Sequence, residues 1–195
     1  MDRPVPARRR GRLPSSGRRD RGIPDRHHRT DEGEGIISNP VIIDATPGQS
    51  YADITREFEA PAAAVFHAHA DPDLFKAWIG PRGYETRLTH WDFRTGGGYR
   101  FEQDGDEGRS YGFRGVFHTV RENELIIQTF EYEGSPDDVS MDIIRFEDLP
   151  GGRSRIVDHS VFPSVEVLDA MIEHGMEQGM REGYEQLDEM LAAGA

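Results

Sequence analysis

Six alternating segments separated by short turns restrict the fold of this chain more than any other feature. Polar and apolar residues alternate along each segment, as they do in strands that bury one face. Loops this short join neighbouring strands in antiparallel order. The sequence therefore predicts a six-stranded antiparallel meander, with strands at residues 84–93, 98–103, 109–121, 125–132, 139–146 and 153–162.

One more strand and two short helices are predicted before the meander. Residues 51–59 alternate like a strand, and residues 62–70 are rich in alanine, as a short helix is. Asp71 is expected to cap a second short helix that ends at Trp78. Residues 36–50 are expected to form an arm or linker that includes a short strand.

Residues 164–193 are predicted to form one long helix that covers the sheet. Gly175, Gly179 and Gly183 lie within or beside its apolar face, although glycine costs about 1 kcal/mol relative to alanine in a helix interior. We expect these glycines either to let the helix pack closely on the sheet or to line a groove. At about 100° per residue, the apolar residues in one arc are Leu168, Ile172, Met176, Met180, Leu187, Met190 and Leu191.

Aromatic residues recur at every second position of the strands and are expected to share one face of the sheet. We expect His159 to be the polar group best placed to reach a cavity between this face and the helix, with Tyr111 and Arg114 as further orienting groups. A shift of one residue in register would exchange every inward side chain for its neighbour. The candidate ligand-binding residues are Trp78, Tyr99, Phe101, Tyr111, Phe113, Phe117, Phe130, Met141, His159, Met176, Gly179 and Met180.

Charge is distributed unevenly along the chain. Residues 1–30 hold ten Arg and three Asp, whereas the remaining residues hold 13 basic and 33 acidic side chains. Residues 1–35 contain too little apolar surface to offset the entropy of ordering, so they are predicted to be a disordered Arg-rich tail. A body this acidic repels phosphate backbones, so we expect no specific nucleic-acid partner.

Several classes of chemistry are excluded or not indicated. The chain has no cysteine, which excludes disulfides, thiolate nucleophiles and cysteine-ligated metals. Its histidines lack metal-ligand spacing and no nucleophile elbow occurs, so no catalytic residue, metal or cofactor is predicted. No apolar run has the length of a membrane span, and no secretion signal is recognised. We therefore expect a cytoplasmic protein, and the use of 22 Arg against one Lys suggests a bacterial source.

The order of elements resembles the helix-grip fold of the START-like (SRPBCC) superfamily. This is an α+β fold, in which a curved antiparallel sheet wraps around a long C-terminal helix and two short helices follow the first strand. Residues 56–61 (REFEAP), 71–78 (DPDLFKAW) and 97–99 (GGY) are similar to motifs of the branch that resembles the activator of heat-shock protein 90 ATPase. The resemblance covers residues 51–193, which we interpret as one START-like ligand-binding domain.

This resemblance implies a deep pocket between helix and sheet that takes lipids, sterols, polyketides or other apolar molecules. The function we expect is non-catalytic binding of a hydrophobic or amphipathic small molecule. The alternative is a chaperone-regulating interaction domain, although residues 1–50 are too short to replace the separate N-terminal domain of the eukaryotic co-chaperones. A third reading is an aromatase-like or cyclase-like enzyme with His159 or a pocket carboxylate as its acid–base group.

Overall fold

The computed structural model describes residues 39–105 and 108–194. The Arg-rich segment 1–35, predicted to be disordered, lies outside the described residues. In chain order the elements are β1 (Ile42–Asp44), β2 (Tyr51–Phe58), α1 (Ala62–Ala70), α2 (Pro72–Trp78), β3 (Glu85–Trp91), β4 (Gly98–Asp104), β5 (Ser110–Arg121), β6 (Leu125–Tyr132), β7 (Val139–Leu149), β8 (Arg153–Val161), α3 (Val165–Glu173) and α4 (Met176–Ala192).

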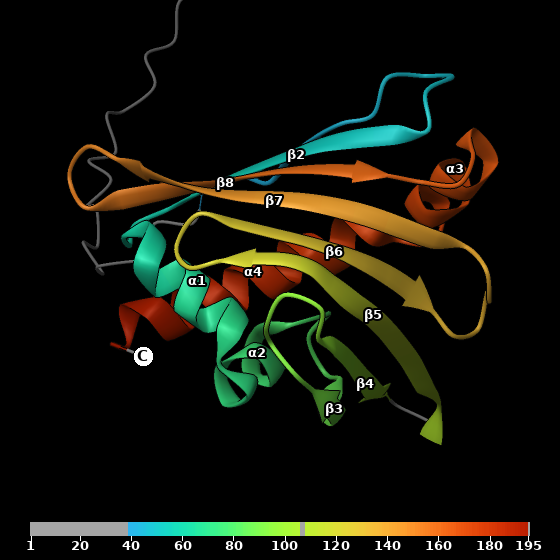
Figure 1. Ribbon diagram of the computed structural model, residues 1–195, viewed down its shortest axis with the longest axis horizontal. Coiled ribbons are helices and arrows are strands. Elements are labelled where there is room, and N and C mark those ends of the chain that lie inside the picture. Colours follow the sequence, from blue (N-terminus) through green and yellow to red (C-terminus); the bar gives the residue numbers. More distant parts are fainter. Residues whose placement is uncertain (1–38, 106–107, 195) are drawn as a thin grey trace, which may run out of the picture. The chain divides into compact units, whose positions relative to one another are not determined.

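The strands form one antiparallel sheet in the order β1-β2-β8-β7-β6-β5-β4-β3 (Figure 1). Strands β3 to β8 are the six predicted segments, and each pairs with its predecessor, so the predicted meander is confirmed. Strand β2 pairs with β8 and so extends the sheet beyond the meander. Strand β1, which lies within the predicted arm, adds an edge strand to β2.

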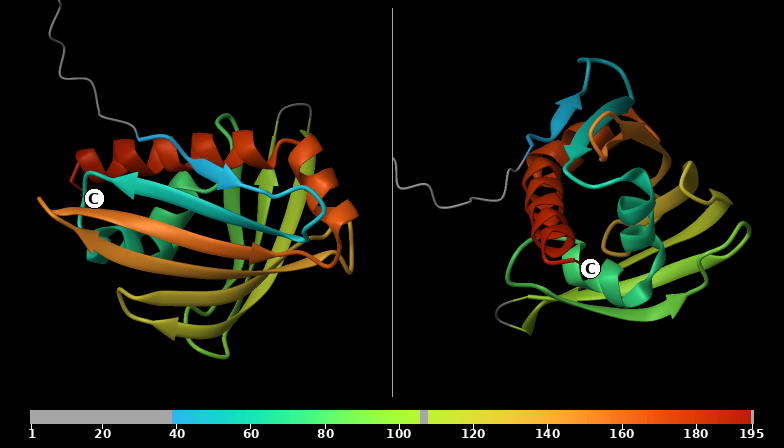
Figure 2. Two further views of the ribbon diagram at one scale, coloured as in Figure 1. Left: turned by 90° about the horizontal axis from the view of Figure 1, so that it is seen from above. Right: turned by 90° about the vertical axis from the view of Figure 1, so that its left-hand side faces the viewer.

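The sheet curves around α4, with α1 and α2 on the same side as that helix (Figure 2). Register shifts between Leu88 and His90 in β3, and between Phe117 and Thr119 in β5, mark irregularities of the kind that bend strands. We call the concave side the inner face and the convex side the outer face. The predicted helix-grip architecture is confirmed.

The corner between α1 and α2 is held by buried polar contacts. Asp71 caps α2, because its side chain accepts hydrogen bonds from the backbone N–H groups of Asp73 at 2.9 Å and Leu74 at 3.0 Å. Trp78 Nε1 donates to the Ala68 carbonyl at 2.8 Å. The ring of His69 lies 4.7 Å from that of Trp78, and burial lowers the pKa of His69 to about 4. His69 is therefore neutral in the folded protein near pH 7.

The single helix predicted for residues 164–193 is wrong, because the chain forms α3 and α4 with His174 and Gly175 between them. Gly175 has a φ of 94°, a left-handed conformation that glycine adopts far more readily than other residues. The apolar periodicity continues across this joint, so the pattern alone gave no sign of it. Within the described residues, no helix is long and apolar enough to cross a membrane.

The C-terminal half of α4 is anchored to the sheet by a buried ion pair. The Arg56 guanidinium on β2 donates to the Asp188 carboxylate on α4, and the two side chains are 1% and 6% exposed. Leu187 is completely buried in the main core. A Cβ on Gly183 would lie 3.1 Å from the Trp78 carbonyl oxygen, so this glycine permits close packing of α4 on the end of α2, whereas the close packing expected was on the sheet.

Candidate functional site

Alternate residues of β7 and β8 face inward, and the set that does so differs from the predicted one. On β7 the buried positions include Ser140 and Asp142, so Met141 lies on the outer face, where it is 41% exposed. On β8 the buried positions include Asp158, so His159 also faces outward. The inward orientation predicted for Met141 and His159 is therefore wrong.

The outward residues have partners of their own. His159 Nδ1 lies 2.8 Å from Asp53 Oδ1 on the neighbouring strand, and both side chains are exposed. Arg114, expected to orient a ligand, is on the outer face as well, where its Nε donates to Glu131 Oε2 at 2.7 Å. The prediction failed because it assigned the apolar set of β7 and β8 to the interior, whereas these strands turn acidic and hydroxyl side chains inward.

Four of the expected aromatic residues lie inside the protein but are already covered by it. Tyr99, Phe101 and Phe117 are 4% or less exposed and contact one another's rings or those of neighbouring aromatic residues. Trp78 is buried between His69 and Tyr184, with ring centroids 4.7 and 5.9 Å away. These side chains form the packed part of the core.

A second group of inward aromatic residues is only half-buried. The ring of Phe113 lies 5.4 Å from those of Phe130 and Tyr132, and Tyr132 lies 6.2 Å from Tyr111. Tyr84, in the loop between α2 and β3, continues the series at 5.9 Å from Tyr111. We call these five residues the aromatic row. It is apolar surface on the concave face of the sheet that the protein's own side chains cover incompletely.

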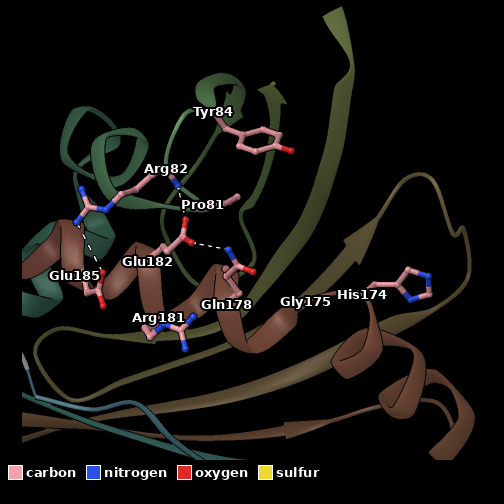
Figure 3. Close-up of a pocket in the computed structure, with 10 residues that line it drawn as sticks. Pro81, Arg82, Tyr84, His174, Gly175, Gln178, Arg181, Glu182 and Glu185 are labelled. Carbon is pink, nitrogen blue, oxygen red and sulfur yellow. Dashed lines mark hydrogen bonds and ion pairs between the residues drawn. The ribbon is translucent and has the colours of Figure 1, made fainter. Parts of the chain in front are cut away.

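A groove of about 710 Å³ lies between the α2–β3 loop and the first turns of α4 (Figure 3). Tyr84 belongs both to this groove and to the aromatic row, so the two adjoin. A Cβ built on Gly175 or Gly179 would meet nothing within 4 Å, so the lack of side chains there leaves space. The lining residues are Pro81, Arg82, Tyr84, His174, Gly175, Gln178, Gly179, Arg181, Glu182 and Glu185.

Polar contacts tie the loop to α4 along this groove. Glu182 Oε2 accepts from the backbone N–H of Arg82 at 2.9 Å, and its Oε1 accepts from Gln178 Nε2 at 2.7 Å. The Arg82 side chain pairs with Glu189 at 2.6 Å. These contacts, led by that from Gln178, lower the pKa of Glu182, so the carboxylate is charged at neutral pH.

The two methionines of α4 that were predicted to bind a ligand pack in different apolar clusters of the core. Met180 packs against the main core cluster, which includes Tyr184 and Leu187. Met176 packs against a smaller cluster of Ala52, Phe162 and Leu168 beneath α3. Both are half-buried.

Buried acidic side chains form a cluster that the sequence analysis missed. We call Gln128, Ser140, Asp142, Asp158 and Ser160, all on the inner faces of β6, β7 and β8, the carboxyl cluster. The Ser160 hydroxyl lies 3.0 Å from Asp142 Oδ1 and 3.3 Å from Asp158 Oδ2, which links the two carboxyl groups. The alternation itself was the available signal, because Ser140 and Asp142 on β7, and Asp158 and Ser160 on β8, lie two residues apart and so share a face of the sheet.

Burial dominates the electrostatics of this cluster. It raises the pKa of Asp142, against the lowering effect of hydrogen bonds from Ser160, Gln128 and Ser140. It raises the pKa of Asp158 well above the ordinary value, and the charge of Asp142 raises it further. Both carboxyl groups therefore lose their protons less readily than exposed carboxyl groups do. In the part of the chain that the structure describes, no three His, Asp or Glu side chains gather as a metal site requires.

Solved structures share this fold. A solution structure of a protein from Arthrobacter aurescens is 26% identical, with a TM-score of 0.71, and covers 83% of this chain and 94% of its own. A crystal structure of a protein from Rhodobacter sphaeroides is 25% identical, with a TM-score of 0.72 and coverages of 80% and 99%. The Mycobacterium smegmatis protein Ms6760, at 24% identity and a TM-score of 0.70, shares the fold, with coverages of 78% and 97%. A comparison with curated proteins finds no significant match.

A family model also matches the chain directly. The match runs from residue 59 to residue 192, which is more than half of the sequence, and it includes both short helices, the meander and α4. The model describes the Activator of Hsp90 ATPase homolog 1-like proteins. Because sequence and fold agree over the same residues, this chain belongs to that family of START-like proteins.

Proposed function

We propose that this protein binds a hydrophobic or amphipathic small molecule between the inner face of the sheet and the N-terminal half of α4, without covalent chemistry. The observation that carries the proposal is the aromatic row, in which four half-buried rings of the concave face are followed by the exposed ring of Tyr84. A protein interior normally packs such surface closely. A ligand lying on the row would complete that packing.

The groove supplies the space that this ligand needs. Its volume of about 710 Å³ lies in the range of small-molecule sites, roughly 300–1,000 Å³. Burial provides the driving force, at about 25 cal/mol for each Å² of apolar surface removed from water. Gly175 and Gly179 add no side chains to the helix side of the groove, which Gln178, Arg181 and Glu182 also line.

A fluorescent apolar probe, N-phenyl-1-naphthylamine, tests the proposal through its gain in emission on entering an apolar site. We expect saturable binding to the full chain and a rise in melting temperature with probe concentration. Phe113→Ala should weaken binding about tenfold, because it removes the ring that contacts both Phe130 and Tyr132. Tyr51→Ala is the matched control, since Tyr51 is a half-buried aromatic residue that packs with His159 on the outer face.

Filling the groove separates binding from folding. Gly179→Leu places a side chain where the structure has space, so it should abolish probe binding while the protein stays folded. Glu177→Leu, at an exposed neighbouring position of α4, is its control and should bind normally. If no probe binds the unaltered protein, or if Gly179→Leu binds as well as the unaltered protein, the proposed location is wrong.

Chaperone regulation is the second candidate, favoured by the family and by apolar side chains on the outer face. Val116 and Met141 are 56% and 41% exposed there. The test is the ATPase rate of heat-shock protein 90 with and without this protein, and with Met141→Glu. An unchanged rate with the unaltered protein would remove this candidate. The position of His159 on the outer face withdraws it as the acid–base group of an enzyme acting in the interior.

A further inference from the structure

The carboxyl cluster contains a buried acceptor that the protein itself leaves unused. Asp158 is 6% exposed and Asp142 is 9% exposed, so both carboxyl groups are largely withdrawn from water. Among the described residues, no donor forms a hydrogen bond with Asp158 Oδ1. Buried polar atoms normally have a partner, so this oxygen marks a place where a donor is missing.

The donors of the cluster are distributed unequally between its two acids. Asp142 has three donors within reach: Ser160 at 3.0 Å, Ser140 at 3.3 Å and Gln128 at 3.4 Å. Asp158 Oδ2 lies 3.3 Å from the Ser160 hydroxyl, which has one proton to give. The backbone N–H of Ile143 also lies near this carboxyl group and acts to lower its pKa. If Ser160 donates to Asp142, it accepts the proton of Asp158, whose other oxygen is then a carbonyl-type acceptor facing no donor.

Positive charge in this part of the interior is already committed. Arg56 is paired with Asp188, and the neutral His69 packs within the α1–α2 corner. The hydrogen bonds that Asp142 accepts come from hydroxyl and amide groups. A donor that also carries positive charge would satisfy the orphan oxygen and stabilise negative charge on either carboxyl group in one step.

The aromatic row leads to the cluster. Phe130 of the row is paired across the strands with Ser140, and Gln128 is paired with Asp142, two residues further along the same face. A molecule whose apolar part lies on the row would thus place its end beside the acids. From this geometry we propose that the ligand carries a hydrogen-bond-donating head group, a protonated amine in preference to a hydroxyl, recognised by Asp158 and Asp142. The proposal rests on the proposed function, because it concerns the polar end of the same ligand.

The same geometry disfavours an anionic head group. A ligand carboxylate would add a second negative charge beside Asp142 in a region of low polarity, and it has no proton to give to Asp158 Oδ1. Fatty acids are therefore expected to bind more weakly than amines or alcohols of the same size. This ranking distinguishes the proposal from simple apolar burial, which would rank the three by their apolar area.

Four naphthalene compounds that differ only in head group test this ranking: 2-methylnaphthalene, 2-naphthalenemethanol, 2-naphthylmethylamine and 2-naphthoate. Each is titrated into the full chain by calorimetry at pH 7 and moderate salt. We expect the amine to bind at least tenfold tighter than the methyl compound, the alcohol to lie between them and the carboxylate to bind weakest. Equal affinities would overturn the head-group proposal and leave the proposed function standing, whereas no binding by any of the four would count against the function itself.

Variants locate the effect within the cluster. Asp142→Asn, which removes an acid, and Asp158→Leu, which removes the buried acceptor, should each lower the affinity for the amine at least tenfold, with little effect on the methyl compound. Asp53→Asn removes an exposed acid from the outer face and is the control for attraction by the acidic surface as a whole. If Asp53→Asn lowers amine affinity as much as Asp142→Asn does, or if neither cluster variant changes it, the assignment to the carboxyl cluster is wrong. Binding of the methyl compound by each variant confirms that it is folded.

Discussion

The two halves of α4 meet the sheet in opposite ways. Its C-terminal half is tightly fixed, by the Arg56–Asp188 ion pair, by Leu187 and by the close approach at Gly183. Its N-terminal half presents Gly175 and Gly179 to open space beside half-buried aromatic residues. One helix can thus combine tight packing with open space beside it, provided that each occupies its own turns.

The largest expected effect comes from breaking the anchor of the fixed half. Asp188→Ala leaves the Arg56 charge buried without its carboxylate, which costs about 3–5 kcal/mol of unfolding free energy. Urea denaturation measures this loss. Glu189→Ala, one residue along the helix, removes only an exposed partner of Arg82 and should have a far smaller effect. Similar losses in the two variants would mean that the fixed half does not depend on its buried ion pair.

The next effect is a dependence of stability on pH that arises in the corner between α1 and α2. His69 has a pKa lowered by burial to about 4, below its ordinary value of 6.5, so its contribution to stability is complete above pH 6.5. This contribution is lost as the pH falls from 6.5 to about 4, by about 3 kcal/mol in total. His69→Phe should flatten the stability curve in that window, whereas His67→Ala, at an exposed position of α1, should leave it steep. An unchanged slope in His69→Phe would assign the acid sensitivity to other groups.

A smaller loss of stability is expected when a side chain is added at Gly183, where α4 closely approaches the end of α2. Gly183→Leu should destabilise the protein by about 1–3 kcal/mol, because its Cβ already meets the Trp78 carbonyl at 3.1 Å. Thermal unfolding checks this. If the variant is as stable as the unaltered protein, the C-terminal half of α4 can accommodate a side chain as its N-terminal half can, and the contrast in packing between the two halves is wrong.

The smallest effect has the opposite sign. Gly179→Ala should stabilise the protein by about 1 kcal/mol, because alanine favours the helix and its Cβ meets nothing within 4 Å. The gain should be visible as a higher urea midpoint with an unchanged slope. A loss of stability would show that the space beside Gly179 closes in solution.

Local pattern was sufficient for most of the fold. The turn residues and the alternation gave β6 (Leu125–Tyr132) its bounds without error, and the other strands of the meander came within a few residues. The inward orientation of Tyr111, Phe113 and Phe130 also followed from alternation. These features depend on neighbouring residues in the chain, which a sequence displays directly.

The rest depended on contacts between distant segments. The inward faces of β7 and β8 were misjudged because Asp142 and Asp158 are buried together. Hydrogen bonds within the cluster, including those of the shared Ser160 hydroxyl, offset part of the cost of burying these carboxyl groups. The groove joins Tyr84 to Gly179, residues brought together only by the packing of α2 on α4. Periodicity along one strand or one helix carries no information about such contacts between segments that are distant in the sequence.

Gly175, the left-handed residue between α3 and α4, lies next to the boundary between two apolar clusters. Leu168 of α3 and Met176 at the start of α4 pack in the small cluster with Ala52 and Phe162, while Leu187 of α4 belongs to the main one. The core beneath α3 is therefore distinct from the packing that fixes the C-terminal half of α4. A substitution in the small cluster should leave that packing largely undisturbed.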